Sequence, residues 1–158
     1  MLNRELSRQI QRLQDLIDKA DVACGTSIEL RAGWAKYICV VSAGLLENAI
    51  KELYIDFAGK KVSHPIASFV ASKLSPIRNP KAEVFLVTAA AFNPTWRAEL
   101  EVYMADDGRG DAIDSIINHR HLIAHGKSHQ SSISLARIKE YLGKAIEVLE
   151  FIEQQCAR

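Results

Sequence analysis

Apolar residues recur along this chain mainly at intervals of three and four, the spacing that places them on one face of a helix. The first such stripe consists of Leu2, Leu6, Ile10, Leu13, Ile17 and Ala20. We expect a helix there that ends near Gly25. A second, long helix is expected to begin after Thr26 or Ser27 and to run through Phe57 until Gly59 stops it. Because this segment is apolar around much of its circumference, it is predicted to be the central and most buried helix.

The middle of the chain contains three prolines, Pro65, Pro80 and Pro94, each placed where a helix is expected to begin. The predicted helices cover residues 65–74, 81–92 and 95–104. The apolar run at 84–87 also fits a buried strand, but no partner strand is found nearby.

A loop with turn chemistry is expected at 106–110, followed by a helix that reaches His125 and stops at Gly126. After a polar loop at 127–132, the last helix is expected to begin near residues 133–134. The predicted fold is therefore all-α: a helical bundle based on the long central second helix and the last helix, in a single domain covering residues 1–158.

The composition fits an ordinary globular domain, with 158 residues, 48% of them hydrophobic and 25% charged. Lys and Arg total 20 against 19 for Asp and Glu, so any contact with RNA has to come from a local patch. The three cysteines are scattered, in apolar contexts that indicate packing, and favour a reducing compartment. The amphipathic N-terminus does not resemble a signal peptide, and no run approaches the roughly 20 apolar residues of a membrane span. We expect a cytoplasmic protein without membrane association.

The candidate chemistry lies in residues 118–126, Asn-His-Arg-His-Leu-Ile-Ala-His-Gly. Arg120 and His125 are five residues apart near the predicted end of a helix. A guanidinium binds phosphate through a planar fork of donors, and an imidazole both accepts and donates protons near neutral pH. Together these groups can cut a phosphodiester by acid–base chemistry without a metal ion.

In its helical context, this segment resembles the Arg-x4-His signature of HEPN domains, and in particular the variant of the RiboL-PSP-HEPN branch. The resemblance covers about residues 30–152. The residue after the arginine is often Asn in the family, whereas here it is His121. Glu47 is similar to an inward acidic residue on the long helix of the family.

The resemblance implies a metal-independent endoribonuclease that acts as a homodimer with a composite site and needs no cofactor. Arg120 would hold the phosphate and His125 would act as general acid or base. His121 and Asn118 would be supporting polar groups, with His119 as a neighbour in the same cleft. Glu47 would orient Arg120 or His125, or else be a solvated carboxylate.

The implied partners are an RNA substrate and a second copy of the chain. The resemblance also implies a toxin-like effector of a defence or toxin–antitoxin system, with a cognate antitoxin or a nucleotidyltransferase as a further partner. Lys127, Lys60 and Lys61 are cations that could follow a phosphate backbone.

Three alternatives stay open from the residues alone. The first is a non-catalytic HEPN-like module that binds nucleotide or RNA, or that serves in regulatory dimerisation. The second is metal binding by His121 and His125, which lie four apart, although no acidic residue stands between them as in a zinc protease helix. In the third, Arg120 forms a surface ion pair and His125 interacts with the helix dipole.

Overall fold

A computed structural model describes residues 3–158, which contain seven α-helices, two short 3-10 turns and no strand. The helices are α1 (Arg4–Cys24), α2 (Ile28–Lys61), α3 (His64–Leu74), α4 (Ala82–Phe92), α5 (Pro94–Ala105), α6 (Arg109–Ala124) and α7 (Leu135–Cys156). The prediction of an all-α fold is confirmed. The segment at 84–87 is helical rather than a strand.

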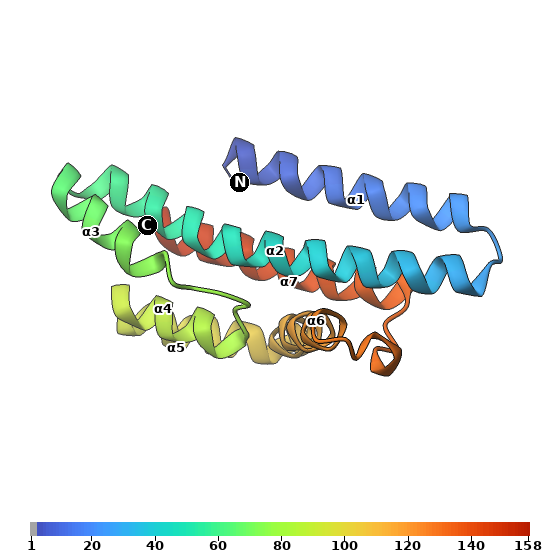
Figure 1. Cartoon of the computed structure of the whole chain (residues 1–158). Helices are drawn as coiled ribbons and strands as arrows, with labels where there is room; N and C mark the ends of the chain where they lie inside the picture. The colour runs from blue at the N-terminus through green and yellow to red at the C-terminus, as the bar shows by residue number, and fades with distance from the viewer. Residues whose placement is uncertain (1–2) are drawn as a thin grey trace.

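The bundle is organised around α2 and α7, which run alongside each other (Figure 1). α1 lies along α2 and also contacts α7 (Figure 1). α6 is seen nearly end on, so its axis crosses those of α2 and α7 (Figure 1). One cluster of buried apolar side chains joins these four helices and includes Ile17, Ile38, Ile116 and Leu149. Within residues 3–158, no helix is both long and apolar enough to cross a membrane.

The expected end of the second helix at Gly59 is wrong, because α2 continues to Lys61. A glycine inside a helix costs only about 1 kcal/mol, and the buried neighbour Ala58 favours continuation. The chain leaves helical geometry at Val62, and Ser63 then precedes α3. The turn between α2 and α3 therefore lies at residues 62–63, directly before α3, and not at Gly59.

The fourth helix also begins later than predicted, at Ala82 rather than at residues 80–81. Two carboxylates from other helices hold the segment before it. The backbone N–H of Asn79 donates to Glu47 of α2 (2.9 Å), and that of Ala82 donates to Asp114 of α6 (2.7 Å). These tertiary hydrogen bonds satisfy backbone donors at and just before the start of α4.

As predicted, the second helix is central and has more buried residues than any other described helix, but one side of its N-terminal half is exposed. Leu30 and Tyr37 are each 55% exposed, and Trp34 is 37% exposed. The other helices pack against the opposite side of this half, where Ala35, Ile38 and Cys39 are buried.

Candidate functional site at the C-terminal end of α6

The segment at 118–126 forms the last turns of α6 and its C-terminal cap, as predicted. His125 is the cap, and its N–H donates to the His121 carbonyl (3.1 Å). Gly126 adopts φ +72°, and the following Lys127 N–H donates to the Leu122 carbonyl (2.9 Å). Because a positive φ favours glycine, the backbone conformation explains why a glycine follows His125 in the motif.

His121 and His125 come together on the exposed side of this helix end. Their ring centroids are 4.2 Å apart, with an angle of 52° between the planes. Both residues are exposed, and so is Asn118, which lies one turn earlier on the same face. Two imidazoles and an amide therefore form an open polar row.

Arg120 lies on a different side of α6. Five residues at 100° each place it about 140° around the helix from His125. It is half-buried, and its guanidinium forms no hydrogen bond or ion pair with any residue in the range 3–158. The surface ion pair considered as an alternative is thus not found there, and a cation without a counter-ion remains available to an anionic ligand.

Cys39 of α2 holds this part of α6, and the sequence pattern did not mark it as a site neighbour. Its thiol donates to the Ile116 carbonyl (3.4 Å) and also receives a hydrogen bond from the backbone amide of Arg120. Burial raises the pKa of the Cys39 thiol to about 12. The thiol is therefore a protonated packing group that positions Arg120, in agreement with the packing role expected for the cysteines.

His119 does not share the exposed face, contrary to the expectation that it lies in the same cleft. Its Nδ1 is 2.8 Å from the hydroxyl of the buried Ser131, in the loop that leads to α7. Burial lowers the pKa of His119. The contact ties α6 to this loop, and Ser131 is a supporting residue that we did not foresee.

Glu47 is also placed elsewhere, contrary to the expected contact with Arg120 or His125. Its carboxylate accepts from the Asn79 backbone and pairs with Lys51 (3.4 Å) and Arg78 (3.7 Å). On α2 it lies eight residues from Cys39, which corresponds to about 12 Å along the helix. In the single chain, Glu47 therefore fixes the segment before α4 and does not orient the motif.

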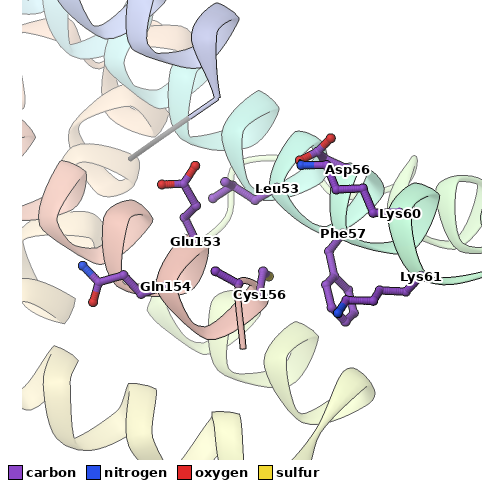
Figure 2. A pocket seen from close by; sticks show the side chains of 9 residues that line it. Leu53, Asp56, Phe57, Lys60, Lys61, Glu153, Gln154 and Cys156 are labelled. Carbon is purple, nitrogen blue, oxygen red and sulfur yellow. The ribbon is translucent and has the colours of Figure 1, made fainter.

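The basic residues expected to follow a phosphate backbone do not form one patch. Lys60 and Lys61 border a cavity of about 450 Å³ at the C-terminal end of α2, near Glu153 and Cys156 of α7 (Figure 2). Lys60 is already paired with Asp56 (2.6 Å). Lys60 lies 21 residues from Cys39, which contacts the motif helix, and this separation corresponds to about 32 Å along α2. Of the three lysines, only Lys127 therefore lies beside the motif.

The metal alternative lacks ligands in the described range. No group of three or more His, Cys, Asp or Glu side chains in residues 3–158 is arranged to hold a metal ion. His121 and His125 supply two ligands, whereas a catalytic zinc site uses three from the protein.

Comparison with known families gives a match over residues 3–158 to the RiboL-PSP-HEPN family. The chain therefore belongs to this HEPN family, as its residues 118–126 had suggested. The family indicates a nuclease or other RNA-related function. No curated protein and no solved structure matched the chain.

Proposed function

We propose that this protein is an endoribonuclease that cuts RNA without a metal ion, as a homodimer whose site combines Arg120 and His125. The observation that carries the proposal is the guanidinium of Arg120, which has no partner within residues 3–158 and lies on the same helix end as two exposed imidazoles in contact. Membership of the HEPN family supports an RNA substrate.

In the proposed reaction, a ribose 2′-hydroxyl attacks the adjacent phosphorus. His125 takes the hydroxyl proton as base, or donates a proton to the departing 5′ oxygen as acid. The new 2′-O–P bond replaces the P–O5′ bond, which leaves a 2′,3′-cyclic phosphate and a 5′-hydroxyl. Arg120 stabilises the negative charge that develops on the phosphate oxygens.

This mechanism is better served by two chains than by one. It uses a base and an acid at the same time, and Arg120 lies on a different side of α6 from His125 of its own chain. A second copy supplies a second imidazole and lets the arginine of one chain share a phosphate with the histidine of the other. His121 and Asn118 then bind the substrate beside the reacting groups.

The pairing between chains is tested by co-expressing Arg120→Ala chains with His125→Ala chains. A mixed dimer keeps one Arg120 and one His125 on different chains but only one His125 imidazole, so cleavage should return in part, at a rate below that of the wild type, even though each variant alone is inactive. If the mixture stays as inactive as its parts while the wild type cuts RNA, each site uses groups of a single chain.

The activity itself is tested with purified protein treated with EDTA and a mixed RNA substrate. Fragments ending in 2′,3′-cyclic phosphate are expected from the wild type and from the matched control variants Arg8→Ala and His64→Ala, whose residues are exposed on α1 and α3. Nucleotide-dependent thermal stabilisation without any fragment would instead indicate the non-catalytic binding module.

The biological part of the proposal is a toxin-like effector controlled by an antitoxin or a nucleotidyltransferase. Expression of the wild type should arrest growth, and the double variant Arg120→Ala/His125→Ala should not. Equal toxicity of the two proteins contradicts this role.

A further inference from the structure

An open apolar groove lies between α3 and α4, at the end of the bundle where α2 finishes (Figure 1). α3 packs mainly on α2 and α4 packs mainly on α5, which leaves a hollow of about 630 Å³ between α3 and α4. We call this hollow the α3–α4 groove. The motif at 118–126 contributes no residue to it. Its walls are mostly apolar and include Phe69, Val70 and Leu74 of α3 and Val84, Val87 and Phe92 of α4.

The apolar positions of both walls repeat at helical intervals. On the α3 side, Val70 is followed by Leu74 and Ile77 at intervals of four and three residues. On the α4 side, Val84 and Val87 are three residues apart. This spacing places side chains on one helix face, so each wall presents a row of apolar side chains to the groove. A third helix lying between the walls meets, on both sides, the repeat of its own side chains.

Large apolar side chains in and beside the groove are exposed. Phe69 and Val87 are each more than half exposed, and so is Ile66, one turn before Phe69. Single exposed apolar residues are ordinary, but a set gathered around one hollow marks an interaction site. Pockets for small molecules bury most of the ligand surface, whereas walls as exposed as these are covered better by a longer partner.

The polar side chains at the groove differ in whether they already have partners. The Thr88 hydroxyl donates to a backbone carbonyl of its own helix (2.7 Å), and the Glu83 carboxylate pairs with Arg97 of α5 (3.1 Å). Lys73, in the last turn of α3, has no carboxylate partner in the described part of the chain, and its ammonium lies 5.3 Å from the ring centroid of Phe69. The groove therefore offers apolar surface and an available cation, while its acidic group is neutralised.

We propose that the α3–α4 groove binds an acidic amphipathic helix of a partner protein. The apolar face of this helix lies between the two walls, and one of its carboxylates pairs with Lys73. Each wall is a helix of 11 residues, which corresponds to about 16 Å, so the bound segment has about three turns. Residues 3–158 contain no strand whose edge could take up an extended peptide, which favours a helix as the occupant.

The occupant is tested by selecting binders from a displayed library of random peptides. The peptides are about 16 residues long, because shorter ones rarely form helices in water. The wild type is the target, and peptides that also bind Phe69→Glu are discarded, since that glutamate places a charge on the α3 wall. The remaining sequences should carry apolar residues at intervals of three and four and a net negative charge. Peptides without this spacing, basic peptides, or no peptides at all overturn the inference.

The α4 wall provides an independent check with one selected peptide that carries a fluorescent label. Val87→Glu should raise the Kd of this peptide at least about 30-fold, and Ala91→Glu, at an exposed position of the same wall, repeats the test. The matched control Val102→Glu replaces a valine that is also more than half exposed, on α5 outside the groove, and should keep the wild-type Kd. Circular dichroism checks that the variants keep their helicity. A wild-type Kd in both α4 variants overturns the inference.

The charge of the partner is tested at Lys73. Lys73→Glu should raise the Kd of the acidic peptide about fivefold or more, because an attraction becomes a repulsion. Lys19→Glu, at an exposed position of α1, is the matched control and should leave the Kd unchanged. A peptide with glutamine in place of its glutamates should bind the wild type and Lys73→Glu equally well. If Lys73→Glu binds the acidic peptide as tightly as the wild type does, the proposed pairing is wrong.

This inference does not rest on the proposed function, and the two can fail separately. Arg120→Ala/His125→Ala should bind the peptide with the wild-type Kd, and Val87→Glu should cut RNA as fast as the wild type, because the groove and the motif share no residue. If the groove binds the peptide and no protein cuts RNA, the groove stands and the proposed function fails. If the wild type cuts RNA but selects no acidic helix, the reverse holds.

Discussion

The two ends of α6 each carry an arginine, and the protein treats the two side chains in opposite ways. Arg109 at the start donates to Glu147 (2.6 Å) and Asp106 (2.9 Å), and its guanidinium lies 4.2 Å from the ring centroid of Tyr103. These partners raise the pKa of Arg109 above its ordinary value. Arg120, eleven residues later, has no side-chain partner among residues 3–158.

This difference in side-chain partners distinguishes an arginine that stabilises the fold from one that is available to bind a ligand. The guanidinium donors of Arg109 bond to α7 and to residues at the end of α5 and just after it, so its charge is neutralised within the chain. The guanidinium donors of Arg120 have no partner in the described part of the chain, and the residue is half-buried on the same helix end as two imidazoles. A guanidinium left in this state is suited to an anion from outside, such as a phosphate.

The largest effects are expected from replacing each of these two arginines with alanine. Under the proposed mechanism, Arg120→Ala should lower the rate of RNA cleavage at least about 100-fold, because it removes the charge proposed to stabilise the transition state. Its unfolding free energy should stay near that of the wild type. Arg109→Ala should do the reverse, keeping cleavage and losing about 1–2 kcal/mol of stability. Cleavage assays and urea unfolding of both variants measure the contrast, and a loss of stability without a loss of rate in Arg120→Ala contradicts it.

The two touching imidazoles are expected to differ in the same assay. His125→Ala should lower the cleavage rate about 100-fold or more, because it removes the proton carrier. His121→Ala should lower the rate about 10-fold, mainly through a higher KM, because the proposed role of His121 is to contact the substrate rather than the reacting atoms. Steady-state kinetics of both variants separate the roles. Equal losses in kcat would instead make His121 a second proton carrier.

A smaller effect is expected from Glu47→Gln, which tests whether this carboxylate belongs to the fold or to the site. The variant weakens the contacts to Asn79, Lys51 and Arg78, so it should lose about 1 kcal/mol of stability. The cleavage rate should change less than about twofold, because the residue lies about two turns of α2 from Cys39. A large drop in kcat at unchanged stability would restore the orienting role.

The smallest effect concerns His119 and pH. Burial lowers its pKa in the folded protein, so between the folded value and the ordinary value of about 6.5 the unfolded chain binds the proton more readily. The contribution of His119 to stability is therefore complete above about pH 6.5 and is lost as the pH falls below it. Urea unfolding from pH 7.5 to 5.0 should show a weaker decline for His119→Gln than for the wild type. His129→Gln, at an exposed position, should follow the wild type.

The helices could be predicted because each leaves a local signal in the chain. The stripe on α1 from Leu6 to Ala20 and the stop at Gly126 lie where periodicity and capping chemistry placed them, and α7 begins at Leu135, within two residues of the predicted start; Leu2 lies outside the described residues. The boundaries at Gly59 and Pro80 were wrong, because they depend on packing and on hydrogen bonds from Glu47 and Asp114.

For this protein, the sequence alone determined the helical fold, the family and the Arg120–His125 segment, since periodicity and short motifs depend on neighbouring residues. Only the tertiary structure decided which polar side chains are already in use. Glu47 and His119 look as functional in the sequence as His121 does, yet one holds the segment before α4 and the other binds Ser131. Their partners are 32 and 12 residues away, and no local pattern encodes such contacts.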